Sequence, residues 1–471
     1  MQVLHHAVSR SDGAVTLYGR DPDGGAVTCV IPRFRTVWVR DASRPKPKRP
    51  SSTRYRQGRG LLSTDACINF AEYAFTGRPP RKDSAESGWY NRRLGKVEAW
   101  YARENITPGT WFTGTQYTTD EELAAAAVRD NSTWAPFCLL VFDMECLPRA
   151  DGGFPTADRD PIIQISAVVD ADMLGEQPQA ACHLFTWRDT TAPLPQIDEY
   201  DPSACKVHVH TSEAEMLVAF VQFVLLADPD VLSGWNIVGF DLPYLIERCA
   251  CLDVACALGR GGLDARVYEC GAGARVTVPG RVVADMLPMW RAQHTERSYK
   301  LDSVAARHLG ASKAPVGYSD MRPLWDGDAD GRARMATYCV KDSWLVWRLG
   351  VTRSIWMNAV QMSKVTYVPL DRIINGGQQI RVFTLLTHYA HRSRIYIPDS
   401  VPLCDAGYEG AVVLPPTPGL YRDCVVTLDF ASLYPSIMMA FNMCYTTQRT
   451  AVTPWELGRS LGLPEAVAKQ V

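Results

Sequence analysis

The sequence lacks the hydrophobic segments that membrane and secreted proteins carry. Residues 1–13 contain no long apolar core of the kind that a signal peptide requires. The longest apolar run, residues 216–227, is interrupted by Gln222 and is too short to cross a bilayer, which takes about 20 residues. We therefore expect no membrane partner, and we predict a protein of the nucleus or the cytoplasm that is not secreted.

Neither sign of charge is in excess. The chain has 49 Lys and Arg residues against 51 Asp and Glu residues, a net charge of −2, so nucleic-acid binding would depend on local basic patches. The 14 cysteines include no C-x₂-C pair, the spacing that zinc sites typically use. We predict no zinc and interpret Cys249, Cys251, Cys256 and Cys270 as buried thiols in a reducing compartment.

The chain is long enough for several domains. Its 471 residues, 46% of them hydrophobic, suggest about three domains with full cores. Residues 1–40 alternate short β-type runs with turns, which predicts a β-rich N-terminal domain. Residues 32–60 then hold ten basic side chains against the single acid Asp41. Because prolines disfavour helix and strand, we interpret this stretch as a loop, either solvated or in contact with phosphates.

Two acids follow an apolar run in the middle of the chain. Asp143 comes directly after residues 137–142, and Glu145 lies two positions further on. Side chains alternate along a strand, so both carboxylates should project from one face at its end. Such close carboxylates raise each other's pKa unless a cation neutralises them. The pair therefore suits a metal site, although Asp-x-Glu also arises by chance.

Helical patterns follow. Ser212 and Glu215 form a capping-box pattern ahead of the apolar run 216–227, which predicts a buried helix. Residues 231–235 then have the pattern of a strand. Asp241 opens the next helix, either as its N-cap or as an acid of a metal site.

A later helix, over residues 332–349, places Tyr338 and Asp342 on one face because they are four positions apart. An acid on this apolar face is either an ion-pair partner or a metal ligand. Just before the helix, residues 326–331 imitate the start of an EF-hand loop. The twelfth position of that loop is Thr337 rather than Glu, so we predict no calcium site.

The last informative stretch is residues 427–447. Asp429 follows the β-branched and apolar residues 425–428, which predict a buried strand, and Pro435 fits the beginning of the helix that comes next. A strand that ends in an acid and turns into a helix suits Mg²⁺ and a phosphate. The acid binds the metal, while backbone N–H groups of the turn face the phosphate oxygens.

Taken together, the middle acids resemble the three motifs of the DEDDy proofreading exonucleases, which have a ribonuclease H-like fold. The Asp-x-Glu pair is followed by N-x-x-x-F-D at residues 236–241 and by Y-x-x-x-D at residues 338–342. The resemblance implies two Mg²⁺ ions per active site, with Mn²⁺ as a substitute, and hydrolysis of the terminal 3′ phosphodiester bond. One ion would be held by Asp143, Glu145 and Asp342, and the other by Asp143 and Asp241.

The same resemblance implies roles for three neighbouring residues. Tyr338 would orient the attacking water, since its unperturbed pKa of about 10 makes it a poor base at neutral pH. Phe240 would stack against the frayed primer end. Asn236 would be a second contact with the DNA.

The stretch around Asp429 resembles the first palm motif of family B replicative DNA polymerases, specifically the delta-like and large-DNA-virus branch. The match runs over D-F-A-S-L-Y-P-S-I-M-M-A-x-N-x-C-Y-T-T. It implies that Asp429 and the carbonyl of Phe430 bind both catalytic Mg²⁺ ions, and that Tyr434 excludes a 2′-hydroxyl. The incoming triphosphate would contact the turn formed by Ser432, Leu433 and Tyr434.

Two further stretches carry resemblances to this family. A segment similar to its R-G-Q-Q-I-K motif implies contacts with the template backbone by Gln378, Gln379 and Arg381. Tyr408 and Gly410 match the family's Y-x-G-G/A motif, which partitions the primer end between synthesis and editing. Glycine in that motif lets the backbone approach DNA closely.

We therefore expect a multidomain protein of α/β and α+β class. It would comprise a β-rich N-terminal domain at residues 1–135, an exonuclease domain at 136–350 and an incomplete polymerase palm at 351–471. The expected function is DNA-directed DNA synthesis with 3′–5′ proofreading, and we expect the chain to be an N-terminal fragment, able by itself to perform at most the exonuclease step.

A large DNA virus is the favoured source, which would place the protein in the nucleus or at a cytoplasmic viral replication site. Implied partners are primer–template DNA, deoxynucleoside triphosphates, and a sliding clamp or another processivity factor. A stand-alone DEDDy exonuclease is the main alternative, and the palm motif argues against it. A non-catalytic scaffold is disfavoured because all the exonuclease acids are present.

Overall fold

The computed structural model describes residues 2–8, 14–20, 23, 25–32, 36–41, 52–60, 67–75, 89–90, 96–108, 110–113, 116–128, 136–175, 180–190, 194, 204–270, 273–312, 316–393, 395–396 and 412–443. These residues form two compact units. The first comprises the described residues within Met1–Arg35 and Trp100–Leu385, and the second those within Thr36–Phe75, Pro79–Ala99 and Leu386–Val471.

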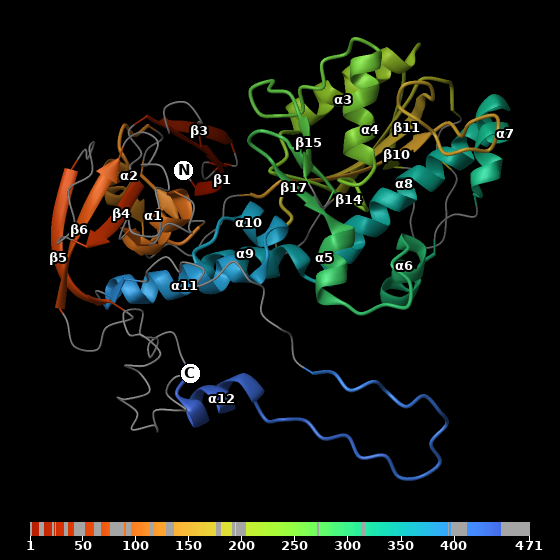
Figure 1. Cartoon of the computed structure of the whole chain (residues 1–471). Helices are drawn as coiled ribbons and strands as arrows, with labels where there is room; N and C mark the ends of the chain where they lie inside the picture. The colour runs from red at the N-terminus through yellow and green to blue at the C-terminus, as the bar shows by residue number, and fades with distance from the viewer. Residues whose placement is uncertain are drawn as a thin grey trace. The chain divides into compact units, whose positions relative to one another are not determined.

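A six-stranded mixed sheet forms the centre of the first unit (Figure 1). In spatial order, its strands are β13 (Lys206–Val209), β12 (Ala180–Thr186), β11 (Ile162–Asp170), β10 (Leu139–Cys146), β14 (Val231–Gly234) and β17 (Val282–Asp285). β10, β11 and β12 pair in antiparallel fashion, whereas β13, β14 and β17 are parallel to the neighbours that they extend. The central strands are buried on both faces, which explains their nearly continuous apolar sequences.

Helices cover both faces of this sheet, as Figure 1 shows. α3 (Glu213–Ala227) and α4 (Asp241–Cys251) pack on one face. The other face carries α5 (Met286–Gln293), α6 (Leu301–Leu309), α8 (Ala329–Thr352), α9 (Ile355–Thr366) and α10 (Leu370–Asn375). Successive side chains of β10 point to opposite faces of the sheet. Leu140 and Phe142 join the core under α3 and α4, while Leu139 and Val141 join the core under α8.

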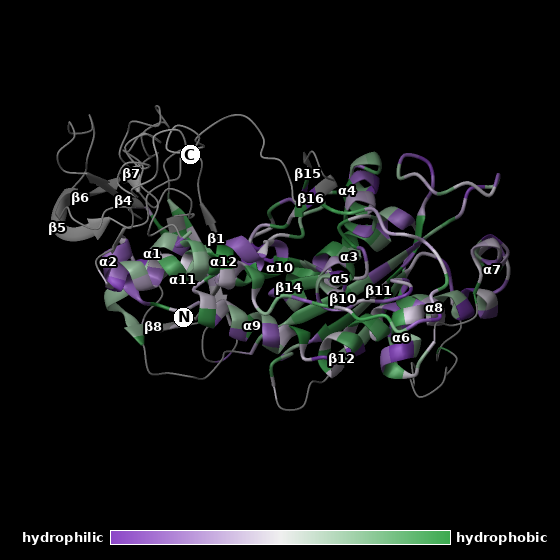
Figure 2. Ribbon diagram, turned by 60° about the horizontal axis from the view of Figure 1, so that its bottom comes forward, coloured by the Kyte–Doolittle hydropathy of each residue, from purple (hydrophilic) through white to green (hydrophobic). Residues whose placement is uncertain are grey.

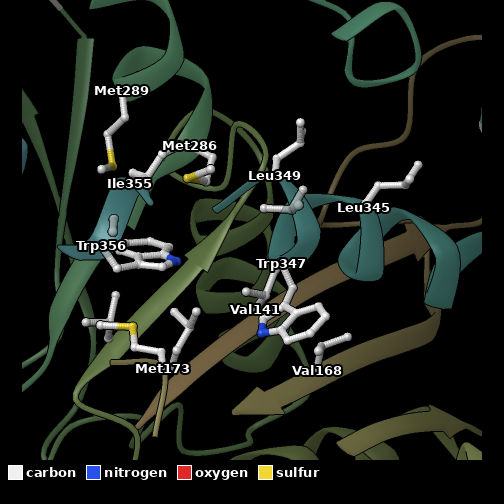
Figure 3. Close-up of a cluster of buried hydrophobic side chains, with 14 of the residues drawn as sticks. Val141, Val168, Met173, Met286, Met289, Leu345, Trp347, Leu349, Ile355 and Trp356 are labelled. Carbon is white, nitrogen blue, oxygen red and sulfur yellow. The ribbon is translucent and has the colours of Figure 1, made fainter. Parts of the chain in front are cut away.

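The core on the α8 side is built from bulky side chains of several elements (Figure 3). Val141 and Val168 of the sheet lie beneath Trp347 of α8, whose indole Nε1 donates to a carboxylate oxygen of Asp170 at 3.0 Å. This hydrogen bond satisfies two polar groups that would otherwise be buried unpaired. Figure 2 shows the hydrophobic colour gathered along the strands of this sheet. α8 is therefore held firmly across the face that also carries the acids of β10.

The first unit also contains a five-stranded sheet near the N-terminus. Its order is β3 (Ala26–Ile31), β2 (Val15–Arg20), β1 (Gln2–Val8), β8 (Trp111–Phe112) and β9 (Ala127–Val128). This sheet confirms the predicted β-rich N-terminal region. Arg20 of β2 pairs with Asp230, just before β14, at 3.0 Å, and Arg260 shares that acid at 2.6 Å. These buried ion pairs join the small sheet to the six-stranded one.

The remaining elements of the first unit connect these layers. The hairpin β15 (Arg266–Cys270) and β16 (Gly273–Thr277) follows α4, and short helices lie elsewhere. They are α2 (Asp120–Ala125), η3 (Tyr318–Asp320) and α7 (Met321–Asp326). Two helices cross the boundary between the units, α1 (Lys96–Glu104) and α11 (Gln378–Arg392).

The second unit contains a sheet that corrects one prediction. Its order is β18 (Ile395–Tyr396), β5 (Ser52–Gly60), β6 (Cys67–Phe75), β4 (Thr36–Asp41) and β7 (Trp89–Tyr90). The basic stretch 32–60 was expected to be a loop, yet β4 and β5 lie within it. The prolines that motivated that expectation are confined to residues 45–50, outside the described part of the chain, and both flanks pair with β6 in antiparallel register.

Residues 412–443 of the second unit contain one helix, α12 (Leu433–Phe441), and no described strand. The helix confirms the start expected near Pro435. The buried strand predicted at residues 425–428 is wrong, since these residues pair with no described strand, and Leu428 is 89% exposed. An apolar run forms a strand only where another chain segment satisfies its backbone N–H and C=O groups.

Candidate metal centre and active site

Strand β10 presents two acids to α8. Asp143 and Glu145 continue the alternation of Leu139 and Val141, so both project toward the face that α8 covers. Asp143 is half-buried and Glu145 is 8% exposed. Together with the sulfur of Cys339 on α8, one oxygen of each carboxylate forms a set whose atoms all lie within 4.8 Å of one another. The part of the chain that the structure describes contains no other such group.

Helix α8 contributes the third motif from the opposite side. Asp342 lies one turn after Tyr338, is 3% exposed and faces the sheet. The helix is fixed to β11 through Ser166, whose hydroxyl donates to the carbonyl oxygen of Cys339 at 2.8 Å and lies 2.6 Å from the Ser343 hydroxyl. These hydrogen bonds set the register of α8 over β10, and thus the position of Asp342 relative to the two acids of the strand.

The fourth acid, Asp241, is the first residue of α4. Phe240 occupies the N-cap position, so the interpretation of Asp241 as the N-cap is wrong. Burial raises the pKa of Asp241 to about 7, and the nearby carboxylates of Asp285 and Asp342 act in the same direction, whereas backbone N–H groups act against it. A buried acid with acidic neighbours is the environment in which a bound cation is most stabilising.

The turn ahead of Asp241 is held by Asp285, at the end of β17. Its carboxylate accepts hydrogen bonds from the backbone N–H groups of Asn236 at 2.9 Å and Val238 at 3.0 Å. The same carboxylate caps α5 by accepting from the N–H of Leu287 at 3.0 Å. Asp285 is thus a positioning residue, and sequence patterns assigned it no role because its partners come from a different strand–helix junction.

Gly234, at the end of β14, has no room for a side chain because neighbouring atoms approach its Cα closely. A Cβ atom there would lie 2.1 Å from Cγ2 of Ile237 and 2.6 Å from the carbonyl oxygen of Phe142. Both distances are shorter than any real contact, so only glycine allows β14 to run beside β10 and turn into α4. This packing brings Asp241 to the edge of the sheet where Asp143 lies.

A cavity of about 610 Å³ opens beside these acids. Asp143 and Asp342 line it together with Asn236, so the structure brings residues of all three predicted exonuclease motifs to one place. The other lining residues are Trp235, Leu287, Arg291, Tyr299, Lys300, Leu301 and Asp302. The guanidinium of Arg291 lies 5.2 Å from the ring centroid of Tyr299.

Sequence reasoning missed these cavity residues. The alternation of basic and aromatic side chains in Trp290-Arg291 and Tyr299-Lys300 was the available signal, because such interleaving is typical of single-strand binding. The backbone of Tyr299 is held by the indole Nε1 of Trp235, which donates to its carbonyl oxygen at 3.2 Å.

Neither of the two aromatic candidates, Tyr338 and Phe240, is among the residues that line this cavity. Tyr338 is half-buried on α8. Phe240 is half-buried and lies edge to face with Phe154 at 5.3 Å between ring centroids. Phe154 is 68% exposed and was not expected, because nothing near it in sequence marks a site. The pair presents aromatic surface to solvent next to Asp241.

The polymerase candidates are not assembled in the same way. Asp429 is exposed, and Phe430 and Tyr434 are 73% and 75% exposed. Ser432 has a positive φ of 53° and precedes α12, whose first residue is Leu433. Among the described residues, no group that could hold a metal ion includes Asp429.

The candidate DNA contacts between the two sites lie in and beyond α11. Gln378 and Gln379 are exposed in the first turn of α11. Arg381 instead donates from Nη2 to the carbonyl oxygen of Ile373 at 2.8 Å, which ties α11 to α10. Tyr408 and Gly410 lie outside the described residues.

Two motifs set aside from the sequence have structural explanations. In the stretch that imitates an EF-hand, Asp328 caps α8 by accepting from the N–H of Gly331 at 2.8 Å, and Asp326 pairs with Arg188. In the cysteine cluster, Cys249 and Cys256 are buried as expected, whereas Cys251 is exposed, because it lies on the outer side at the end of α4.

The donor chemistry of the acid site fits a divalent metal ion. Four carboxylates supply the hard oxygen ligands that Mg²⁺ and Mn²⁺ prefer. Burial raises the pKa of the Cys339 thiol well above its ordinary range, with the charges of Asp143 and Glu145 adding to the effect. This shift disfavours the free thiolate, so Cys339 is not a nucleophile.

Comparisons with known proteins agree with this arrangement. Residues 87–304 match the family model described as DNA polymerase family B, exonuclease domain, and residues 368–457 match the model described as DNA polymerase family B. In the part of the chain that the structure describes, no helix has the length and apolar character needed to cross a membrane.

Curated relatives include cellular and viral polymerases. The chain is 36% identical over 359 residues to the DNA polymerase delta catalytic subunit of Oryza sativa subsp. japonica, covering 73% of this chain and 31% of the relative. It is 35% identical over 339 residues to the DNA polymerase catalytic subunit of Human herpesvirus 8 type P (isolate GK18), covering 68% and 32%. The chain thus spans about a third of the length of these relatives.

A solved structure supports the fold. The family B DNA polymerase from the hyperthermophilic archaeon Pyrobaculum calidifontis matches with a TM-score of 0.63 and 22% identity, covering 94% of this chain and 56% of that one. The sheet, the acid motifs and these matches define a DNA polymerase class that carries an exonuclease domain. More narrowly, the chain belongs to the family B DNA polymerases.

Proposed function

We propose that the chain supplies the 3′–5′ proofreading exonuclease and the first catalytic acid of a DNA-directed DNA polymerase. The observation that carries the exonuclease is the convergence of three elements. Asp143 of β10 and Asp342 of α8 line one cavity, and Asp342 lies close enough to Asp241 of α4 to raise its pKa.

The finer assignment is two Mg²⁺ ions, for which Mn²⁺ can substitute. Asp143, Glu145 and Asp342 would hold one, and Asp143 and Asp241 the other. When bound, such ions lower the pKa of a water molecule and offset charge on the scissile phosphate. Tyr338 is the residue we assign to orient that water, because a phenol hydroxyl can both donate and accept a hydrogen bond.

The cavity gives the site a means of holding a single strand. Arg291 and Lys300 are exposed at its rim and are suited to phosphate oxygens, while Trp235 and Tyr299 offer ring surfaces for bases. The edge-to-face pair of Phe240 and Phe154 would stack on the frayed primer end. Asn236, which lines the same cavity, would be a further polar contact.

The polymerase assignment rests on the palm motif and on the match over residues 368–457. Asp429 and the carbonyl of Phe430 would bind two Mg²⁺ ions, and the Ser432-to-Tyr434 turn would contact a deoxynucleoside triphosphate. Gln378, Gln379 and Arg381 would contact the template, and Tyr408 and Gly410 would act in partitioning. Primer–template DNA and a processivity factor are the proposed partners, in the nucleus or at a viral replication site.

We also propose domain boundaries near residues 135 and 350. They are supported by the start of β10 at Leu139 and the end of α8 at Thr352. A stand-alone exonuclease remains the second candidate, because Asp429 joins no acid group among the described residues, unlike Asp143. The two candidates differ in whether Asp429 has any function.

The exonuclease is tested with single-stranded and 3′-mismatched DNA in Mg²⁺. Asp143→Ala should lower the hydrolysis rate on the order of 1,000-fold, because metal ions supply several kcal/mol of transition-state stabilisation. Asp326→Asn, an acid on α7 outside the site, is the matched control and should keep the rate. Full activity in Asp143→Ala would refute the proposed site.

Primer extension by the same chain separates the two candidates. We expect none, because a two-metal transferase needs more than one acid at its site, and among the described residues Asp429 belongs to no group of acids that could hold a metal ion. Incorporation that disappears in Asp429→Asn would show instead that the polymerase site is complete in this chain.

A further inference from the structure

Cys339 of α8 lies beside the two acids of β10. It is fully buried, and its sulfur belongs to the set of ligand atoms, with Asp143 and Glu145, that lie within 4.8 Å of one another. Its thiol also points toward the backbone carbonyl oxygen of Asp143 at 3.7 Å. Neither the exonuclease motifs nor the two-ion assignment gives this cysteine a role.

The bland interpretation is that Cys339 is a small apolar side chain packed between helix and strand, with a weak S–H donor. That interpretation accounts for the contact with the Asp143 carbonyl. It gives no role to the spacing of the sulfur and one oxygen of each carboxylate, which all lie within 4.8 Å of one another. One thiolate and two carboxylates form a donor set that suits Zn²⁺ or Cd²⁺, whereas Mg²⁺ takes oxygen ligands alone.

We propose that Cys339 provides a third, sulfur donor beside Asp143 and Glu145 for thiophilic divalent ions such as Zn²⁺, Cd²⁺ and Co²⁺, which bind there and inhibit the exonuclease by displacing the ions that the reaction uses. This inference rests on the proposed exonuclease function of the same acids. Binding breaks the S–H bond of Cys339, forms a sulfur–metal bond and releases the proton to water.

The geometry allows this with small movements. In a tetrahedral site, bonds of about 2.0 to 2.3 Å place ligand atoms roughly 3.5 Å apart, so the three atoms must close by about 1 Å. The backbone at Cys339 is held by Ser166 on β11, so the side chains of the two acids make most of the adjustment. A fourth position is left for water or for Asp342, one helical turn further along α8.

The consequence is metal discrimination by one side chain. Ions that accept sulfur gain a ligand at this site, and ions that require oxygen do not. Replacing Cys339 should therefore weaken Cd²⁺ binding far more than Mn²⁺ binding. A purely structural role would weaken both ions equally, because distortion of Asp143 and Glu145 affects every metal.

The test compares wild type, Cys339→Ser and Cys339→Ala with the control Cys138→Ser, which replaces a buried thiol just before the start of β10. Dissociation constants for Cd²⁺ and Mn²⁺ are measured by calorimetry on the whole chain. The ratio of Cd²⁺ to Mn²⁺ affinity should fall at least tenfold in both Cys339 variants and stay unchanged in Cys138→Ser. An unchanged ratio in both Cys339 variants would overturn the proposal.

A second measurement needs no substitution at Cys339. X-ray absorption at the cadmium edge of wild type loaded with one equivalent should show a sulfur neighbour, and that neighbour should persist in Cys251→Ser, which removes an exposed competing thiol. A shell of oxygen alone, or loss of sulfur in Cys251→Ser, contradicts the proposal. Failure of the exonuclease itself is recognised separately, by Asp143→Ala retaining Mg²⁺-dependent hydrolysis.

Discussion

Asp143 and Asp429 both follow an apolar run, yet the two runs behave differently. Residues before Asp143 form β10, paired with β11 on one side and β14 on the other and covered on both faces. Val425, Val426 and Leu428, before Asp429, are 69%, 73% and 89% exposed and pair with no described strand. The same kind of sequence therefore builds a site only where neighbouring strands complete its hydrogen bonds.

The comparison extends to electrostatics. In the region of Asp143, burial raises the pKa of Asp241, and the charges of Asp285 and Asp342 add to the effect. A bound metal ion would neutralise these closely spaced negative charges and so stabilise the cluster. The carboxylate of Asp429 lies in solvent, which already stabilises its charge. The first region is thus preorganised for metal binding, whereas the second provides the residues of a motif without the surrounding structure.

The strongest way to sharpen this contrast is to neutralise one acid from each region. Asp342→Asn should lower exonuclease activity on the order of 1,000-fold, since it removes a buried ligand. Asp429→Asn should leave that activity within about twofold, because the residue is exposed and surface changes rarely exceed 0.5 kcal/mol. Equal losses in both variants, measured as initial rates on single-stranded DNA, would contradict the comparison.

Burial should also be visible in a titration outside the site. His183 on β12 lies 3.1 Å from the ring of His208 on β13, between Phe223 of α3 and the solvent, with Lys206 nearby. Desolvation, together with the charges of His208 and Lys206, lowers the pKa of His183 to about 4. As the pH falls, the imidazole is therefore protonated in the unfolded chain before it is protonated in the folded one. Stability that is present at pH 7 is lost as the pH falls from about 6.5 toward 4.

Because the His183 ring is only half-buried, solvent screening reduces the loss to about 2 kcal/mol. Urea unfolding should be measured at pH 7 and at pH 5, with hydrogen-exchange protection of β12 as the readout. The loss of stability between the two pH values should be smaller in His183→Gln than in wild type. Identical losses in the two proteins would mean that the imidazole is not desolvated in the folded state.

The smallest expected effect concerns the cavity beside the acids. Arg291→Ala or Lys300→Ala should raise the KM for single-stranded DNA about tenfold and reduce the slope of log K against log salt by about one, because each removes one phosphate contact. The rate at saturation should change little. Lys300→Arg keeps the charge and is the matched control. A fall in kcat without a change in KM would place these residues outside the strand path.

Local sequence patterns predicted the parts of the fold that depend on near neighbours. Alternation placed Asp143 and Glu145 on one face, and the pattern beginning at Ser212 predicted α3, where the Ser212 hydroxyl accepts from the N–H of Glu215 at 3.2 Å. Spacing placed Tyr338 and Asp342 one turn apart. Each of these inferences uses only the period of a single helix or strand.

The remaining features of the site depend on contacts between different helices and strands, which the repeat pattern of one element cannot predict. The approach of Cys339 to the acids of β10 follows from the register of α8, which hydrogen bonds to β11 determine. The bridging role of Asp285 needs the turn at Asn236 to fold against β17. The strand expected before Asp429 was wrong for the same reason, since a strand is a property of a pair.

The central claim is that the acids of β10, α4 and α8 form one preorganised metal site and that Asp429 does not belong to it. The most direct test is the Mn²⁺ dissociation constant of the chain, measured by electron paramagnetic resonance for wild type, Asp143→Asn and Asp429→Asn. We predict weakening of about 100-fold or more in Asp143→Asn, beyond what loss of a supporting residue costs, and a change within about twofold in Asp429→Asn. Equal Mn²⁺ affinity in wild type and Asp143→Asn would contradict the account.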